Sequence, residues 1–257
     1  PGLKTISLTV NSTLGTNTIV KQVFVGTAPP RSCLTRTGGG TEFGAFGNFT
    51  LGELNYSYNF RYGFVYDDNS CTDVAILTPG ATYTFKGNVG LVSQNVRSTL
   101  QVFIDYNNDG DFLDAEEAVH TSPECIMGEY NFSFVVPAGL TVTNNVLRMR
   151  VIGLACDNAL SNGCTVAGNS KITDFGVLSL EPEKRFYVDS DRDGYGDPNS
   201  KAWLRSVTAP PGYSTNGDDC DDNLPSINPA TQWVKDMDGD TYYTGEPVIQ
   251  CVSPGAD

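Results

Sequence analysis

The organisation of this chain follows from one acidic stretch, Phe103-Ile104-Asp105-Tyr106-Asn107-Asn108-Asp109-Gly110-Asp111-Phe112-Leu113-Asp114-Ala115-Glu116-Glu117. Its side-chain oxygens alternate at Asp105, Asn107 and Asp109 before a glycine, and Glu116 follows that glycine after five further residues. This is the D-x-[DN]-x-[DN]-G-x5-E spacing of an EF-hand-type calcium loop. A hard cation needs several oxygens converging on one point and a glycine for the sharp turn between them. The loop therefore predicts calcium, and the alternative is a polar turn, because Asn, Asp and Gly are ordinary turn residues.

The residues before this loop predict a β-strand. Residues 98–104 alternate and are rich in β-branched and aromatic side chains, which is typical of a strand. We therefore expect a calcium loop that hangs on a β-sheet and holds a structural ion. Asp111 is a further candidate ligand, and the choice between Glu116 and Glu117 as the closing ligand stays open.

The composition indicates all-β structure with a cation as partner. The 257 residues include 27 glycines, 12 tyrosines and 13 phenylalanines, and only 18% are charged, which favours short strands joined by many turns. The 30 acidic residues outnumber the 16 basic ones, and the formal net charge is −14. Nucleic acid is excluded as a partner because it requires a basic surface. No stretch approaches the apolar length of a membrane span.

The region from residue 31 to residue 181 predicts a β-sandwich. Strand-like segments recur there with turn residues between them; they are residues 72–77, 81–87, 98–104, 130–136, 146–154 and 171–180. This region resembles the GEVED domain of secreted bacterial multidomain proteins. The resemblance rests on Cys33, Leu77-Thr78-Pro79-Gly80, the acidic loop with the strand before it, Leu147-Arg148-Met149-Arg150-Val151 and Ile172-Thr173-Asp174-Phe175.

Two departures qualify what the GEVED resemblance implies. The five residues that name the family fall on Ser170-Lys171-Ile172-Thr173-Asp174, where only the aspartate is kept. The family's glutamate at the end of the loop falls on Glu117, whereas the calcium-loop spacing selects Glu116. The resemblance implies a secreted β-sandwich with a calcium loop.

The first 27 residues predict a β-hairpin. Its strands are expected at residues 5–10 and 18–25, and two strands alone are marginally stable in water. The hairpin resembles the last two strands of a PKD domain, an immunoglobulin-like module of surface proteins. We therefore expect the chain to be part of a longer multidomain protein, with a hairpin and linker at 1–29, a sandwich at 30–182 and a tail at 183–257.

The tail has the composition of a segment that needs metal for cohesion. Residues 183–257 hold 14 acidic and 6 basic side chains, a net −8, and too few apolar residues for a conventional core. Carboxylates alternate before a glycine in residues 189–197, and a related segment follows 47 residues later. The alternative is a disordered acidic linker. The predicted ligands are Asp189, Asp191, Asp193, Tyr195, Asp197, Asp218, Asp219, Asp221, Asp222, Asp236, Asp238, Asp240 and Tyr242.

This internal repeat resembles two known kinds of metal-binding repeat. Asp189-Ser190-Asp191-Arg192-Asp193-Gly194-Tyr195-Gly196-Asp197, then Asp218-Asp219-Cys220-Asp221-Asp222, then Asn228-Pro229-Ala230 follow the pattern of the MopE-type metal-binding repeat. The same arrangement is similar to the calcium repeats of thrombospondins. The resemblance implies an irregular tail that is stabilised by several calcium ions.

A run of aromatic residues suggests a second kind of binding. Aromatic rings occupy six alternate positions, Tyr56, Tyr58, Phe60, Tyr62, Phe64 and Tyr66, and on one strand they would share a face. One interpretation is a stripe that faces the core. The other is an exposed platform for sugar rings, with Tyr56, Tyr58, Tyr62 and Tyr66 as glycan-binding residues.

The seven cysteines favour disulfides in an oxidising compartment, because no C-x-x-C pair is present and one histidine makes a poor zinc set. Proximity in sequence predicts the pairs Cys33–Cys71, Cys156–Cys164 and Cys220–Cys251, with Cys125 unpaired. We therefore expect a secreted or cell-surface protein.

Catalysis is not expected from this chain. His120 is its only histidine, so a Ser-His-Asp or Cys-His arrangement would have to use it. The predicted function is that of a non-catalytic, calcium-binding structural or adhesive segment, with an extracellular glycan or surface protein as a further partner. The alternative is a carbohydrate-binding module that is accessory to a secreted hydrolase.

Overall fold

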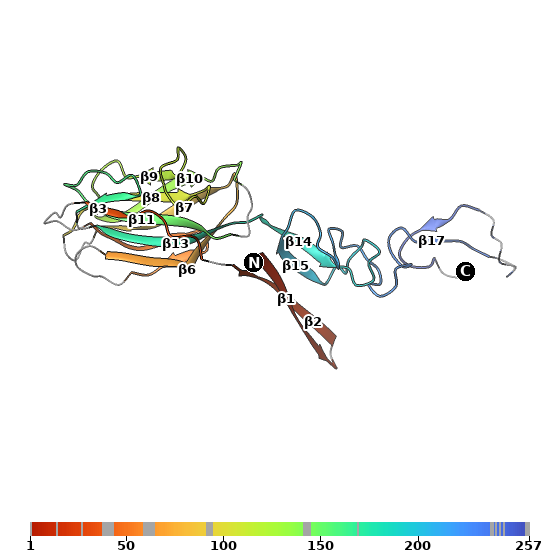
Figure 1. The fold of residues 1–257 in the computed structure, drawn as a ribbon. Coiled ribbons are helices and arrows are strands. Elements are labelled where there is room, and N and C mark those ends of the chain that lie inside the picture. The colour runs from red at the N-terminus through yellow and green to blue at the C-terminus, as the bar shows by residue number, and fades with distance from the viewer. Residues whose placement is uncertain are drawn as a thin grey trace. The chain divides into compact units, whose positions relative to one another are not determined.

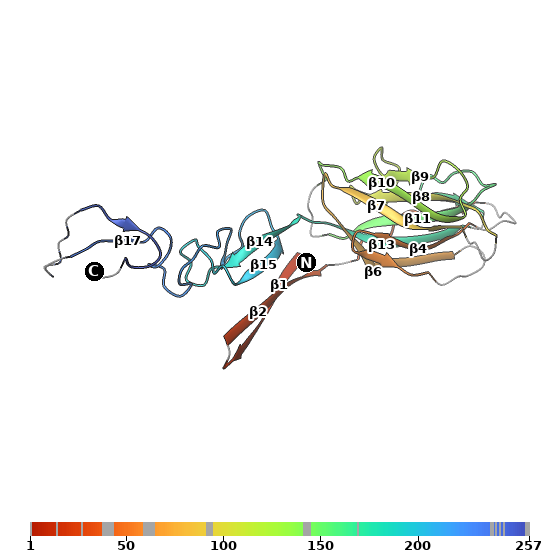
Figure 2. The same cartoon turned by 180° about the vertical axis from the view of Figure 1, so that it is seen from behind.

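The structure, a computed structural model, is built from strands (Figures 1 and 2). It describes residues 2–13, 15–26, 28–37, 44–58, 65–90, 95–140, 145–168, 170–236, 239, 241, 243 and 245–254. No helix occurs in these residues, so the all-β prediction is confirmed. In the same ranges, no helix is long and apolar enough to cross a membrane.

The chain divides into two compact units, which differ from the three predicted parts. One unit comprises Pro1–Leu3 and Phe24–Leu180, and the other comprises Lys4–Val23 and Glu181–Asp257. The predicted boundaries at residues 29 and 182 stay predictions.

The first unit is a β-sandwich of two sheets. The four-stranded sheet has the order β10-β7-β4-β5, and the five-stranded sheet has the order β6-β13-β11-β8-β9. Neighbouring strands are antiparallel except β6 and β13, which run parallel. The strands are β4 (Phe46–Leu51), β5 (Leu54–Tyr56), β6 (Val65–Leu77), β7 (Thr82–Val89), β8 (Ser98–Asp105), β9 (Ala118–Thr121), β10 (Gly128–Val135), β11 (Leu147–Ala155) and β13 (Lys171–Ser179).

Aromatic side chains fill the space between the two sheets. The Phe49 and Phe85 rings stack with centroids 4.5 Å apart, and Phe175 meets Phe49 and Tyr56 edge-on at 5.2 and 4.9 Å. Strands β4 and β7 alternate between buried and exposed residues, as expected for a sheet with one solvated face. Each large side chain that is fully buried stabilises the fold by about 1.5–3 kcal/mol, so the sandwich has an apolar core of its own.

A third layer covers the outer face of the five-stranded sheet. Strands β8, β11 and β13 are buried at every residue, which requires cover on both faces. The cover includes two short parallel strands, β3 (Thr35–Thr37) and β12 (Thr165–Ala167). Phe103, Ile152 and Ile172 point into this layer and form a second apolar cluster with Cys33 and Leu34 packed against it.

Buried arginines attach the segment before β3 to this sheet. Both Arg148 and Arg150 bond to the carboxylate of Asp174, at 3.0 Å and at 2.7 Å. Arg148 also donates to the carbonyl of Pro30 at 3.0 Å, and Arg150 donates to the carbonyl of Cys33. These bonds satisfy the buried charges, which would otherwise be costly.

Two of the three predicted disulfides are wrong. The structure pairs Cys33 with Cys164 and Cys125 with Cys156, and it leaves Cys71 exposed and free. Cys33 meets Cys164 because β3 runs beside β12, each strand starting just after its cysteine. In this sheet, therefore, strand pairing rather than proximity in sequence selects the partners.

Cys125 and Cys156 are brought together by strand β8. Ala155 pairs with Ser98 in the β11–β8 ladder, and Ser98 forms an isolated bridge with Ile126 on its other side. Each cysteine therefore lies next to a residue that pairs with Ser98. The third prediction, Cys220–Cys251, agrees with the structure.

The second unit has much less regular structure. Its strands are β1 (Gly2–Ser12), β2 (Gly15–Val25), β14 (Glu183–Val188), β15 (Lys201–Arg205), β16 (Tyr213–Ser214), β17 (Gln232–Trp233) and β18 (Val248–Ile249). The predicted hairpin is confirmed, because β1 and β2 pair with each other. The first residues of β1 and the last residues of β2 are assigned to the first unit, and the rest of the hairpin to the second. Among its described residues, the buried apolar cluster consists of Phe186, Ala202 and Leu204, with Val20, Ala209 and Tyr213 packed against it.

Candidate metal centres

The acidic loop joins β8 to β9 and wraps around Asp105. This residue ends β8 and is 1% exposed. Its two carboxylate oxygens accept the N–H groups of Asp109 at 3.2 Å and Gly110 at 3.0 Å. Asn108 and Gly110 have positive φ angles of 60° and 96°, so the turn uses the glycine as the calcium-loop spacing requires.

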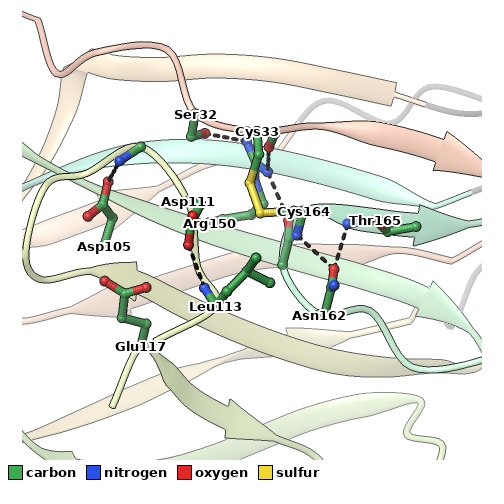
Figure 3. Close-up of a disulfide and its surroundings, with 12 residues drawn as sticks. Ser32, Cys33, Asp105, Asp111, Leu113, Glu117, Arg150, Asn162, Cys164 and Thr165 are labelled. Atoms are coloured by element: carbon green, nitrogen blue, oxygen red, sulfur yellow. Dashed lines mark hydrogen bonds between the residues drawn. A yellow bond between two sulfur atoms is a disulfide. The ribbon is translucent and has the colours of Figure 1, made fainter. Parts of the chain in front are cut away.

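The next polar side chains along the loop also accept hydrogen bonds from backbone N–H groups of the loop. The Asn107 side-chain oxygen accepts the N–H of Asp109 at 3.0 Å, and Asp109 accepts that of Asp111 at 3.0 Å. Asp111 in turn accepts the N–H of Leu113 at 2.8 Å (Figure 3). Each bond spans two residues, and together they curl the loop so that successive oxygens lie along it.

The buried glutamate of this loop is Glu117. It is 2% exposed, whereas Glu116 is exposed to solvent. The Glu117 carboxylate accepts the N–H groups of Tyr106 at 3.2 Å and Asp114 at 3.3 Å, and Figure 3 shows it beside Asp105. The geometry therefore favours Glu117, the position that the GEVED resemblance implies, over Glu116.

Charge crowding is unfavourable in this loop. Burial raises the pKa of Glu117 to about 7, and the negative charges of Asp105 and Asp109 act in the same direction. Burial also raises the pKa of Asp105. A bound cation would remove this cost, because an opposite charge favours the ionised carboxylates.

The loop is fixed to the disulfide-linked layer. The carbonyl of Gly110 accepts the N–H of Cys33 at 2.9 Å. Phe112 is buried in the cluster that includes Cys164, and the Arg150 guanidinium lies 4.8 Å from the centre of its ring. Figure 3 shows the loop, the disulfide and Arg150 as neighbours. The loop is thus held in place by packing as well as by its own hydrogen bonds.

The first loop of the tail repeats this backbone design. Asp189 is buried, and its carboxylate accepts the N–H groups of Arg192 at 2.7 Å and Gly194 at 3.2 Å. Arg192 and Gly194 have φ angles of 66° and 97°, close to those at the equivalent positions of the sandwich loop. Asp193 continues the curl by accepting the N–H of Tyr195 at 2.8 Å.

The second tail loop shows the same design where it is described. The Asp236 carboxylate accepts the N–H groups of Gly239 at 2.7 Å and Thr241 at 2.9 Å. Gly239 and Thr241 have φ angles of 77° and 73°. The predicted ligands Asp238, Asp240 and Tyr242 lie outside the described residues.

Carboxylates gather closely only in the tail, as far as the described residues extend. Two groups of three have ligand oxygens within 4.8 Å of one another: Asp189, Asp191 and Asp193, and Asp191, Asp219 and Asp222. One buried oxygen of Asp191 and one of Asp219 have no hydrogen-bond partner. Burial and the neighbouring negative charges raise the pKa of both residues.

The acidic cluster at residues 218–222 folds back onto the first tail loop. The N–H of Asp219 bonds to the carbonyl of Gly196 at 3.1 Å, and the Asp222 carboxylate accepts the N–H and hydroxyl of Ser190 at 2.8 and 2.6 Å. The Asn228 amide donates to Asp193 at 2.7 Å. Ser190 and Asn228 were not predicted as site residues, although Asn228 opens the Asn-Pro-Ala segment of the repeat.

The other predicted tail ligands lie outside the two carboxylate groups. The Asp197 carboxylate accepts the N–H of Asn199 and the hydroxyl of Ser200. Asp218 is exposed, and Asp221 bonds to the N–H of Asn223. Their role as ligands, like that of Tyr195, stays a prediction.

The tyrosine stripe does not form one exposed platform in the described residues. Strand β5 ends at Tyr56, whose side chain is buried in the core, so the core-facing interpretation is confirmed there. Tyr58 is half-buried with the Lys171 ammonium 3.8 Å from its ring centre, and the Tyr66 hydroxyl donates to Asp174 at 3.0 Å. Tyr62, Phe60 and Phe64 lie outside the described residues.

The single histidine packs against aromatic residues of the neighbouring sheet. The His120 ring stacks on Phe132 with centroids 3.7 Å apart, and its Nε2 lies 3.0 Å from the Tyr130 hydroxyl. Burial lowers its pKa.

Comparison with known proteins gives one match, to a family model over part of the chain. No curated protein and no solved structure matches the chain, and the MopE-type, thrombospondin and PKD resemblances remain expectations. The family model of the GEVED domain matches residues 99–178, which run from β8 to β13 and include the acidic loop. Within that range, the part of the sandwich that holds Asp105, Glu117, both buried arginines and Asp174 is similar to a GEVED domain.

Proposed function

We propose that this chain is a non-catalytic, calcium-binding structural or adhesive segment of an extracellular protein. The observation that carries the proposal is the group formed by Asp191, Asp219 and Asp222, in which buried carboxylate oxygens lack hydrogen-bond partners. A buried polar oxygen without a partner is costly. A cation bound among these oxygens would satisfy them.

The chemistry of the donors favours calcium. The groups offer carboxylate oxygens, and neither contains a histidine or a thiol. Oxygen donors select hard cations, and calcium accepts six to eight of them in flexible geometry. In the sandwich loop, Asp105, Asn107, Asp109 and Glu117 would hold an ion of the same kind.

The small core of the tail supports a structural role for the ions. The three buried apolar residues of the described part of the tail supply little stabilisation, whereas an ion that binds only the folded state adds stability by mass action. Calcium would therefore contribute directly to folding of the tail, as metals do in other small domains. Three disulfides are compatible with an oxidising, extracellular setting.

Elemental analysis and calorimetric titration of the purified chain test the proposal. The chain is equilibrated with calcium and then desalted, and we expect more than one bound calcium ion per chain. Asp191→Asn should remove at least one ion or weaken its binding strongly. Glu246→Gln removes the same negative charge at an exposed carboxylate of the tail that is not a predicted ligand, and it serves as the matched control.

Two results would count against the proposal. One is a chain that takes up no calcium at millimolar concentration. The other is an equal loss of calcium in the Asp191 and Glu246 variants, because this would trace binding to general negative charge and not to the cluster.

A further inference from the structure

The outer face of the four-stranded sheet carries a polar groove that is separate from the acidic loops. Its volume is about 400 Å³, within the range of about 300–1,000 Å³ that is typical of ligand sites. All four strands contribute to it. The residues that line the groove are Asn48, Phe49, Thr50, Asn55, Lys86, Gly87, Asn88, Glu129 and Asn131.

Strand register explains why these side chains gather. Asn131 of β10 pairs with Lys86 of β7, Lys86 pairs with Thr50 of β4, and Thr50 pairs with Asn55 of β5. These four residues form one row across the whole sheet, and all of them are exposed. Polar side chains in one row can contact a single extended ligand that lies across the strands.

The register of β4 is irregular beside this row. The β4–β7 register shifts between Phe46 and Phe49, which leaves Gly47 and Asn48 next to Asn88. A Cβ atom at Gly47 would lie 3.2 Å from the Cβ of Asn88. Because Gly47 carries no side chain, β4 can approach Asn88 more closely here than a larger residue would allow.

The polar groups of the groove are available to a ligand. In the described part of the chain, Asn55, Lys86, Asn88, Glu129 and Asn131 make no side-chain hydrogen bond or ion pair with another residue. Asn48 is held in place, since its side-chain oxygen accepts the N–H of Tyr58 at 2.7 Å. On the same two strands, outside the groove, Thr84 and Ser133 bond to each other at 2.8 Å.

We propose that this groove binds a neutral glycan. The amides of Asn55, Asn88 and Asn131 can each donate and accept, which matches the neighbouring hydroxyl groups of a sugar. One lysine and one glutamate balance each other, so neither a polyanion nor a polycation is favoured. The only aromatic residue of the lining, Phe49, is buried, so hydrogen bonds, and not ring stacking, would carry the recognition.

Affinity electrophoresis of the full chain through gels that contain neutral polysaccharides tests this inference, with calcium present throughout. We expect at least one neutral polysaccharide to retard the chain. The double variant Asn88→Ala with Asn131→Ala should weaken retardation by about tenfold or more, because each lost hydrogen bond contributes a severalfold change in affinity. Thr84→Ala with Ser133→Ala alters the same two strands outside the groove and should bind normally.

Thermal unfolding of both double variants should give midpoints close to that of the unmodified chain, which checks that the fold is kept. The proposal is overturned if no neutral polysaccharide retards the chain or if acidic polysaccharides alone do so. It is equally overturned if both double variants bind alike. Retention by the Asn88 and Asn131 variant but not by the control variant would place the ligand elsewhere on this sheet and would also contradict the proposal.

Discussion

The sandwich and the tail carry the same kind of acidic loop on different supports. Asp105 is the last residue of β8, and Asp189 directly follows β14. The carboxylates of both residues accept N–H groups from a turn with two positive φ angles. In the sandwich this turn rests on an apolar cluster and a disulfide. In the tail it rests on a second acidic segment that folds back over it. If both loops bind calcium as proposed, an ion would only add to the stability of the sandwich, whereas the tail would depend on it.

Removal of calcium should produce the largest difference in stability between the sandwich and the tail. With a chelator present, we expect residues 181–257 to be cut rapidly by protease while residues 44–180 stay protected by their own core. Limited proteolysis with mass spectrometry of the fragments measures this difference. Equal protease resistance of the tail with and without chelator would contradict the proposed dependence of the tail on calcium.

Loss of the buried Asp174 carboxylate should destabilise only the sandwich. Asp174→Ala removes the buried carboxylate that both arginines contact and leaves Arg148 with Asp68 alone; breaking a buried ion pair costs about 3–5 kcal/mol. Denaturant unfolding should show this loss in the sandwich transition. The control is Asp157→Ala, which removes an exposed carboxylate of the same unit; a similar loss in both variants would contradict the role of Asp174.

The disulfides should matter differently in the two regions. Replacing Cys33 and Cys164 by serine should lower sandwich stability by about 2–5 kcal/mol, yet leave it folded because its core remains. Replacing Cys220 and Cys251 by serine frees the segment that carries Asp219 and Asp222, so we expect weaker calcium binding there. Calorimetric titration compares the two variants, and unchanged calcium affinity in the second would contradict this coupling.

The smallest expected effect concerns one strained residue of the tail. Thr241 has a φ angle of 73° at a position where the other two loops have Gly110 and Gly194, and a β-branched residue is disfavoured there. Thr241→Gly should stabilise its loop by about 1 kcal/mol, seen as slower proteolysis of residues 232–254 in calcium. Gly194→Thr should destabilise the first tail loop. If neither variant changes the rate of proteolysis, backbone strain at this position does not affect the stability of these loops.

Local patterns in the sequence predicted local structure well. The spacing of Asp105, Asn107, Asp109 and Gly110 predicted the curl of the loop, because each hydrogen bond there spans only a few residues. Alternation of side chains likewise predicted most strands of the sandwich. The short strands β3, β4, β5, β9 and β12 were not predicted, since they are only three to six residues long and such short segments give a weak periodic signal.

Properties that depend on pairing between distant strands could not be predicted in this way. Cys33 and Cys164 are 131 residues apart and meet only because β3 and β12 align. The burial of Glu117 and the exposure of Glu116 depend on how the end of the loop packs, which the spacing of the motif does not specify. The polar row of the four-stranded sheet is invisible in sequence, because its members come from four strands and share no local motif.

The buried arginines also bear on how the sandwich would respond to tension. A pull applied through the backbone before Pro30 would first meet the guanidinium bonds to the Pro30 and Cys33 carbonyls. It would then meet the Cys33–Cys164 bond, which is covalent. Both anchors lie over the centre of the five-stranded sheet and not at its edge strands β6 and β9. Force would thus be spread over several strands together, so peeling of one strand from the edge is avoided.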